Sequence, residues 1–449
     1  MNKKPNIVFV FADQWRQQAT GYAGNTNVHT PNLDKLSKES MNFTHAISGC
    51  PVCTPYRASL LSGQTPLTHG VFVNDVPFSP NTQSIAKTFS RGGYKTAYIG
   101  KWHVDGHGRS VYIPKERQQG FAYWKVLECT HDYNNSPYYA GDSDKKLFWE
   151  GYDAIAQTKD AETYIKEHAN KEPFMLMLSW GPPHAPYHTA PEKYKKMYNA
   201  DDIKLRPNVP ESAEKEAKEN LAGYYAHCTA LDDCIGEIQS TIKKCGIEEN
   251  TVFVFTSDHG DMLGSHGYKK KQQPWDESIR VPFLFKYPGT ENWQPKEMQT
   301  LIDAPDIMPT LLGLCEIPIP QSVEGLDFSE HIKGGEDPSD GAALLSCAHP
   351  FGQWNSINMG GREYRGIRTK QYTYVTDLNG PWLLFDNEKD YYQQNNLINK
   401  PSVASIQSKL HKTLVSKLKK NDDNFLPGMD YIKKFNYSVD ETLTVPHQN

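Results

Sequence analysis

Long apolar runs are missing from this sequence. No stretch approaches the roughly 20 apolar residues that a membrane-spanning helix needs, so we expect no membrane partner. An excess of positive charge is missing too, because 48 lysines and arginines face 53 aspartates and glutamates, for a formal net charge of -5. A general nucleic-acid binder needs a basic face, so we expect no nucleic-acid partner. An anionic substrate is still compatible with this balance where positive side chains converge in one cleft.

The marks of a secreted protein are also scarce. The eight cysteines in 449 residues are scattered without the spacing of a disulfide framework, so most are expected to be buried thiols. The first predicted strand begins at residue 6, which leaves too little chain for a secretory signal of about 15–30 residues. As the chain stands we expect a cytoplasmic protein, and a periplasmic one if a leader was removed.

Short apolar runs alternate with amphipathic stretches over the first two-thirds of the chain. Continuous apolar runs of this length indicate strands that are covered on both faces. The predicted strands are 6–12, 95–99, 174–180, 251–256 and 281–285, and the predicted helices are 31–40, 84–91, 159–169, 222–245 and 304–314. This alternation predicts an α/β sandwich around a large, mainly parallel central sheet.

The last hundred residues have a different pattern. Stretches 364–374 and 381–385 favour antiparallel strands joined by turns, and 402–418 has the apolar periodicity of one amphipathic helix. We therefore predict a catalytic α/β domain over residues 1–345 and a smaller α+β subdomain over residues 346–449.

Acidic side chains follow two of the predicted strands. Asp13 closes the strand that starts at residue 6, and Asp258 follows the strand that starts at residue 251. Chemistry in parallel sheets collects at the carboxyl ends of the strands, so we expect both carboxylates at the active edge of the sheet.

The segment 53–63 carries the most specific pattern in the chain, CTPYRASLLSG. It resembles the signature of the sulfatase family, Cys-x-Pro-x-Arg followed by Ala-x-Leu and a small residue before glycine. Tyr56 stands where the family commonly has Ser or Ala. With the shorter motifs below, the resemblance runs from Asn6 to about Pro282. It implies an alkaline-phosphatase-like fold and a sulfuric ester hydrolase.

The resemblance also implies a modified nucleophile. In the family, a sulfatase-maturing enzyme oxidises the cysteine that matches Cys53 to formylglycine, whose hydrate attacks sulfur. Arg57 matches the family arginine that holds this hydrate. A different interpretation of Cys50-x-x-Cys53 is a redox or zinc half-site, but the sequence has no second cysteine pair at metal-ligand spacing.

A divalent metal site is implied next. Asp13, Gln14, Asp258 and His259 match the metal ligands of the family, which hold the cation against residue 53. Calcium is the family default and prefers oxygen ligands. Gln14 and His259 replace a commoner Asp and Asn, and an imidazole suits Mn²⁺, Zn²⁺ or Fe²⁺ better, so Mn²⁺, Mg²⁺ and Zn²⁺ stay open.

Four further residues match family elements that bind sulfate or move protons. Lys101 and His103 form a Lys-x-His pair, in which Lys101 neutralises sulfate and His103 is either a base or an orienting group. His184 lies in a Pro-His-x-Pro turn, and the resemblance implies that it contacts sulfate. Lys271, aligned on the sequence Ser-Ile-Arg-Val-Pro that follows it, matches the catalytic lysine of the family. The resemblance implies that either His184 or Lys271 protonates the leaving alcohol.

Substrate identity is only weakly indicated. Sulfatases of this length and pattern are common in bacteria that degrade polysaccharides, so by analogy we expect a sulfated carbohydrate. Candidate contacts for its carboxylate or sulfate groups are Arg16, Arg109, Arg362, Arg365 and Arg368. The aromatic-rich stretch 129–139, with Trp149, is either the rim of a sugar pocket or a packed loop.

Two rival functions remain at this stage. A phosphonate monoester or phosphodiester hydrolase shares the scaffold and favours an Asp-Gln and Asp-His metal set like the one here, but tends to lack the Lys101-x-His103 pair. A binding protein for sulfated glycans would be favoured by loss of Cys53 or of a metal ligand, and neither is lost.

Overall fold

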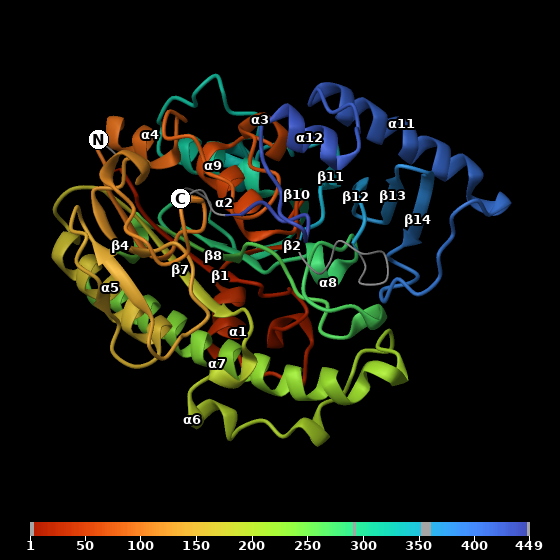
Figure 1. Ribbon diagram of the computed structural model, residues 1–449. Helices are drawn as coiled ribbons and strands as arrows, with labels where there is room; N and C mark the ends of the chain where they lie inside the picture. The colour runs from red at the N-terminus through yellow and green to blue at the C-terminus, as the bar shows by residue number, and fades with distance from the viewer. Residues whose placement is uncertain (1–3, 291–292, 352–360, 447–449) are drawn as a thin grey trace.

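The computed structural model describes residues 4–290, 293–351 and 361–446, and a large twisted sheet runs through its middle (Figure 1). Within these residues the sheet has ten strands, in the order β10-β2-β9-β8-β1-β7-β3-β4-β5-β6. Their bounds are β1 (Asn6–Asp13), β2 (Met41–Ala46), β3 (Lys95–Lys101), β4 (Tyr123–Leu127), β5 (Pro137–Ala140), β6 (Leu147–Phe148), β7 (Phe174–Pro183), β8 (Thr251–Ser257), β9 (Phe283–Lys286) and β10 (Lys296–Ile302). The four central strands β8, β1, β7 and β3 are parallel, which confirms the predicted mainly parallel sheet.

Helices cover both faces of this sheet, as the fully buried central strands require. Along β1, Ile7 and Phe9 belong to one apolar core, and Val8 and Val10 to the other. The first core contains α2 (Cys53–Ser62), α4 (Ile85–Arg91) and α9 (Ala304–Leu314), and the second contains α1 (Pro31–Lys38), α5 (Asp153–His168) and α7 (Glu214–Lys244), as Figure 1 shows. Among the described residues, no helix is both long and apolar enough to cross a membrane.

Some helices and strands begin at other residues than predicted, because polar residues flank their apolar stretch. Helix α9 has the predicted bounds, whereas α5 and α7 begin earlier than residues 159 and 222. The first turns of α7 are mostly charged, and only Ala217 and Leu221 among them are buried, so the apolar stripe there is thin. Strand β9 begins at Phe283 instead of residue 281, after Pro282, which has no backbone N–H to donate.

A second sheet follows, with an antiparallel order β11-β12-β13-β14 in the described part of the chain. Its strands are β11 (Ala342–Cys347), β12 (Tyr364–Thr369), β13 (Tyr372–Asp377) and β14 (Gly380–Asp386), and helix α11 (Ala404–Lys420) packs against it. This is the α+β region that the sequence predicts. Strand β11 spans the proposed boundary at residue 345, and Tyr431 and Ile432 pack into the first core of the large sheet. The division into domains 1–345 and 346–449 stays a prediction.

Candidate active site

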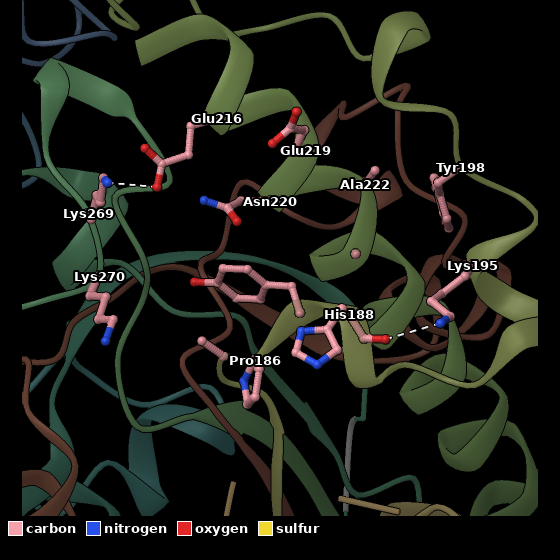
Figure 2. A pocket seen from close by; sticks show the side chains of 13 residues that line it. Pro186, His188, Lys195, Tyr198, Glu216, Glu219, Asn220, Ala222, Lys269 and Lys270 are labelled. Carbon is pink, nitrogen blue, oxygen red and sulfur yellow. Dashed lines mark hydrogen bonds and ion pairs between the residues drawn. The ribbon is translucent and has the colours of Figure 1, made fainter. Parts of the chain in front are cut away.

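A cavity of about 590 Å³ lies between the segment that follows β7, helix α7 and the segment around Lys270 (Figure 2). Its lining includes Pro186 and Lys270. These positions lie within two residues of His184 and Lys271, which the sequence identifies as site residues. The size falls within the range of about 300–1,000 Å³ that is typical of small-molecule sites.

The two predicted carboxylates meet because β1 and β8 are parallel neighbours in register. Ala12 pairs with Ser257, so Asp13 and Asp258 leave the sheet at the same edge. The backbone N–H of Asp258 donates to the carbonyl of Ala12 at 3.2 Å, which continues the pairing one residue further. Both carboxylate side chains are completely buried.

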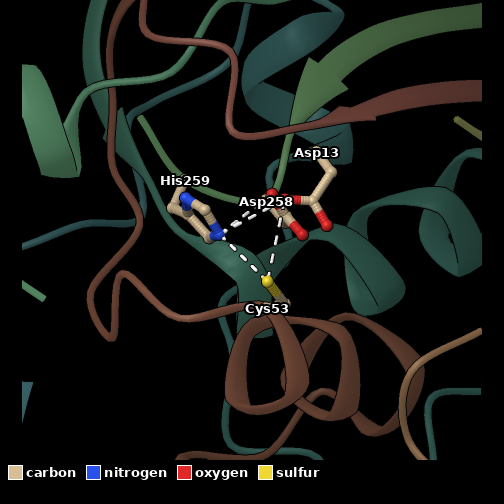
Figure 3. Close-up of side chains that lie close together, drawn as sticks. All are labelled: Asp13, Cys53, Asp258 and His259. Atoms are coloured by element: carbon tan, nitrogen blue, oxygen red, sulfur yellow. Dashed lines mark hydrogen bonds and ion pairs between the residues drawn. The ribbon is translucent and has the colours of Figure 1, made fainter. Parts of the chain in front are cut away.

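Cys53, the first residue of α2, reaches the same point from the other side, and Figure 3 shows its sulfur facing the strand ends. Its Sγ lies 3.7 Å from Oδ1 of Asp13 and 3.2 Å from Nε2 of His259. One ligand atom each from Asp13, Cys53, Asp258 and His259 fall within 4.8 Å of one another. Four of the five predicted metal positions are therefore clustered and buried.

The His259 imidazole is oriented as a ligand of a divalent cation would be. Nδ1 of His259 lies 2.9 Å from the carbonyl of Gly260 and donates to it, so the lone pair on Nε2 faces the cluster. Burial lowers the pKa of His259 to about 4, which keeps the imidazole neutral, as a metal ligand must be.

Gln14 supplies the fifth predicted position. Its Nε2 donates to Oδ2 of Asp261 at 2.6 Å, which fixes the amide. The buried Oε1 of Gln14 has no hydrogen-bond partner among the described residues. Leaving such an oxygen unpaired costs about 1–3 kcal/mol, and a bound cation would satisfy it. The residues thus fit a divalent cation.

Three cations surround the buried carboxylates. Nζ of Lys101 lies 2.5 Å from Asp13, and the Arg57 guanidinium lies 3.3 Å from Asp13 and 3.0 Å from Asp258. Nζ of Lys271 donates to Sγ of Cys53 at 2.8 Å. Burial alone would raise the pKa of Asp13, but Lys101 and other nearby cations hold it well below its usual value. The site therefore concentrates positive charge although the whole chain is acidic.

The positive charge of Lys271 and Lys101 distinguishes Cys53 from Cys50. Burial and Asp13 raise the pKa of the Cys53 thiol, yet Lys271 and Lys101 outweigh them and the net shift is downward. For Cys50, which is also buried, burial raises the thiol pKa to about 12. Residue 53 is thus the position where a negative charge is stabilised, as a nucleophile that attacks an anionic ester requires.

His184 and His103 follow two different strands and have different environments. His184 follows β7, and burial together with Lys271 lowers its pKa well below the usual value, so the imidazole is neutral in the free protein. His103 follows β3, and its Nε2 lies 3.1 Å from Oδ1 of Asp75. Asp75 also accepts from Nη2 of Arg109 at 3.0 Å. The sequence interpretation missed Asp75, because nothing local marks a residue that reaches His103 through the fold.

His131 is the second site residue that the sequence did not single out. It is exposed and stacks on His184, with ring centroids 4.8 Å apart and planes 9° apart. Most of the aromatic stretch around it is a packed loop, since Tyr133 and Trp149 are buried in the second core. In the sequence, His131 stands among aromatic residues, and no local pattern separates an imidazole that contacts the site from one that packs in the core.

Three of the five candidate sugar-binding arginines are buried and engaged within the protein. Arg365 pairs with Asp423, and Arg368 makes two bonds to Asp276 of 3.0 and 3.1 Å. The Arg16 side chain is 1 % exposed, and its Nη1 donates to the carbonyls of residues 261 and 262. None of the three guanidinium groups is therefore accessible to a sugar in this structure.

The other two arginines are partly exposed. Arg362 pairs with Asp377 at 2.5 Å and lies over the ring of Trp382 in the second sheet. Arg109 is 42 % exposed and holds Asp75, the partner of His103. Of the five candidates, Arg109 is therefore the accessible guanidinium that adjoins the predicted site residues.

The buried Arg368 pair gives a stability prediction. It ties β12 to Asp276, the first residue of α8 (Asp276–Ile279), on the segment that follows Lys271. Replacing Arg368 by Ala removes two hydrogen bonds from the buried Asp276 carboxylate, which keeps Arg280 at 3.2 Å, so we expect the free energy of unfolding to fall by about 2–3 kcal/mol in urea titrations. Arg362→Ala, a partly exposed pair on the same sheet, should cost only about 1 kcal/mol. Equal losses for both variants would contradict this assignment.

Comparisons with known proteins agree with this geometry. Residues 5–317 match the family model described as Sulfatase, and residues 264–420 match the one described as N-sulphoglucosamine sulphohydrolase, C-terminal. An ulvan-active sulfatase of Formosa agariphila is 48 % identical over 97 % of this chain and 85 % of its own length. An endo-4-O-sulfatase of Bacteroides thetaiotaomicron is 31 % identical over 93 % of this chain and 92 % of its own.

Solved structures show the same fold. A structure from work on glycosaminoglycan metabolism by Bacteroides thetaiotaomicron superposes with a TM-score of 0.83 at 30 % identity, covering 97 % of this chain and 99 % of that one. The phosphonate monoester hydrolase of Agrobacterium radiobacter superposes with a TM-score of 0.76 at 22 % identity, covering 93 % and 96 %. The second likeness is one of fold alone.

Proposed function

Because this chain belongs to the sulfatase family, we propose that it removes sulfate from a sulfated carbohydrate with formylglycine made from Cys53. The observation that carries the proposal is the setting of residue 53. It begins a helix, faces two buried carboxylates and accepts a hydrogen bond from Lys271. An anionic ester needs such cations beside the nucleophile.

The substrate class rests on the relatives. The 48 % identical sulfatase is named for ulvan, and the 31 % identical one for endo-4-O-sulfate removal. We propose that the substrate here is likewise a carbohydrate derived from a sulfated polysaccharide.

Maturation of Cys53 by a sulfatase-maturing enzyme is part of the proposal. The Cys53 side chain is 1 % exposed and lies under the strand ends, so the oxidising enzyme has to act before the chain has folded. Formylglycine supplies a hydrated aldehyde, one hydroxyl of which is a nucleophile while the other allows sulfate to be released. The mass of the peptide that carries residue 53 reports this modification directly.

A divalent cation is proposed at the cluster, held by Asp13, Gln14, Asp258 and His259 with residue 53. When bound, it supplies Lewis-acid catalysis at the sulfate oxygens and at the nucleophile. We propose Ca²⁺, the family default, and the metal content of purified protein tests it against Mn²⁺, Mg²⁺ and Zn²⁺.

The residues of the chain have separate roles in the proposed reaction. Lys101 and Lys271 neutralise the sulfate group. The Arg57 guanidinium, which Asp13 and Asp258 hold in place, binds the oxygen of residue 53. His184 is neutral in the free protein, and a bound anion would raise its pKa. The protonated imidazole or Lys271 then donates the proton to the leaving alcohol. Asp75 orients His103, so that its other nitrogen can take the second hydroxyl's proton.

A phosphonate monoester or phosphodiester hydrolase is the second candidate, favoured by the Gln14 and His259 positions of the metal set. The Lys101-x-His103 pair, whose side chains contact Asp13 and Asp75, favours the sulfatase. Protein co-expressed with a maturing enzyme should release inorganic sulfate from sulfated oligosaccharides, with kcat/KM at least about 100-fold above that for a phosphonate monoester. Faster phosphonate cleavage would reverse the assignment. Tight binding of sulfated oligosaccharide without release, by matured and metal-loaded protein, would instead support a glycan-binding protein.

A further inference from the structure

Gln14, the residue after β1, has a strained backbone that is held at both of its polar groups. Its φ of 70° lies in the left-handed region, which costs a non-glycine residue about 1–3 kcal/mol. The backbone N–H of Gln14 donates to Oδ1 of Asp258 at 3.0 Å, and its carbonyl accepts from the Tyr224 hydroxyl at 2.7 Å. These two bonds fix residue 14 at the strand end, against one of the predicted metal ligands.

The Gln14 side chain is oriented by Asp261, a completely buried residue in the segment after β8. Nε2 of Gln14 donates to Oδ2 of Asp261 at 2.6 Å. An ionised carboxylate only accepts hydrogen bonds, so the amide has to turn its nitrogen to Asp261 and its oxygen away from it. This contact leaves Oε1, which has no hydrogen-bond partner among the described residues, as the atom that can bind a cation.

Asp261 is itself held by two donors. Its Oδ2 accepts from the Tyr187 hydroxyl at 2.5 Å, and its Oδ1 accepts from the backbone N–H of Leu263 at 3.0 Å. Tyr187 begins the turn η3 (Tyr187–Thr189), which follows β7, whereas Leu263 lies two residues beyond Asp261. Two separate segments therefore fix both carboxylate oxygens, and Asp261 faces Gln14 in one defined orientation.

The contact also changes the charge that Gln14 offers to a metal. Asp13 and Asp258 are carboxylates, whereas an amide is a neutral ligand. A hydrogen bond from the amide nitrogen to a carboxylate polarises the amide and increases the negative charge on its oxygen, and burial strengthens this effect. Asp261 is not one of the four residues of the metal-competent cluster, so its negative charge acts on the site from one bond further away.

We propose that Asp261 is a positioning residue of the metal site. Its carboxylate presents Oε1 of Gln14 to the cation and strengthens that oxygen as a ligand, and Tyr187 holds Asp261 in place. The inference rests on the divalent cation of the proposed function, and it assigns a role to two residues that the sequence did not single out. The metal site thus extends from the strand ends to the turn after β7.

The test measures cation binding by calorimetry, on full-length protein that is stripped of metal with a chelator and titrated with Ca²⁺ or Mn²⁺. Asp261→Asn removes the charge and turns one acceptor into a donor, so we expect Kd to rise about 10- to 100-fold. Tyr187→Phe keeps the carboxylate but removes the hydroxyl, for an expected rise of about 3- to 10-fold. An unchanged Kd for Asp261→Asn overturns the proposal, and an unchanged Kd for Tyr187→Phe overturns the part assigned to Tyr187.

A double-mutant cycle decides whether Asp261 acts through Gln14. Gln14→Ala removes the amide, and in that background Asp261→Asn should change Kd by less than about threefold. A rise as large as in the parent background would show that Asp261 acts directly on the cation or on the fold, which overturns the proposal. If Asp261→Asn does not fold, Tyr187→Phe takes its place in the same cycle, and a Kd within about twofold of the parent then counts against the proposal as a whole.

Asp232→Asn is the matched control for loss of a buried carboxylate. Asp232 is also completely buried, but its side chain accepts hydrogen bonds from Asn32 and Leu33 of α1. We expect its Kd to stay within about twofold of the parent, with thermal unfolding of the metal-free protein recorded for each variant. A rise equal to that of Asp261→Asn would make the effect a general one of buried charge and overturn the proposal.

Cation binding needs neither maturation nor turnover, which separates this inference from its premise. If Asp261→Asn weakens cation binding while matured, metal-loaded parent cleaves no sulfate ester, the proposed function fails and the role of Asp261 stands. If matured parent cleaves sulfate esters but binds neither Ca²⁺ nor Mn²⁺, the role of Asp261 fails and the sulfatase assignment stands.

Discussion

Cys53→Ala is expected to abolish sulfate release, with kcat falling by at least about 10³-fold. The reason is that in the proposed mechanism residue 53 alone provides the nucleophile, whereas the surrounding lysines only stabilise charge. Release of inorganic sulfate from a sulfated oligosaccharide, followed by ion chromatography, measures the effect. Activity within tenfold of the parent would refute the assigned nucleophile.

Cys50→Ala is the matched control for this experiment. Cys50 is also buried and lies three residues earlier in the chain, but burial raises its thiol pKa to about 12 and it is not in the metal-competent cluster. We expect Cys50→Ala to retain activity while its thermal unfolding stays close to that of Cys53→Ala. Equal loss of activity in both variants would indicate a disturbed fold instead of a lost nucleophile.

Lys271→Ala is expected to lower kcat/KM by about 10²- to 10³-fold, because it removes a preorganised cation from the place where the sulfate charge develops. The ammonium of Lys271 lies 2.8 Å from Sγ of Cys53 and 3.2 Å from Nε2 of His259, and the residue is 4 % exposed. Metal content should be measured in parallel, so that lost catalysis is separated from a lost cation.

Lys269→Ala tests the alignment that selects the third lysine of the run at 269–271. Lys269 is exposed and paired with Glu216, so its removal should change kcat/KM by less than about threefold. If Lys269→Ala were the more damaging of the two variants, the alignment that selects Lys271 would be wrong by two residues. Lys101→Ala should resemble Lys271→Ala, and Asp13 keeps Arg57 as a partner at 3.3 Å in that variant.

Much of the fold follows from local patterns. The four central strands are continuous apolar runs because both of their faces are covered, and this makes them visible in the sequence. Strands nearer the edges were not predicted. In β10, for example, Lys296 and Glu297 are exposed and only alternate residues near them are buried, so no continuous apolar run marks the strand.

The sequence by itself determined the candidate nucleophile and the acidic residues of the candidate metal site. The motif around Cys53 and the acids after β1 and β8 are set by local chain geometry, since parallel strands deliver their ends to one edge. Only the tertiary structure decided which other residues join them. Asp75 reaches His103, and His131 stacks on His184, across segments that are distant in the chain. Arg368 resembles a ligand-binding arginine in sequence, yet it is buried against Asp276. Burial and partners at long sequence separation are properties of packing, which no local pattern records.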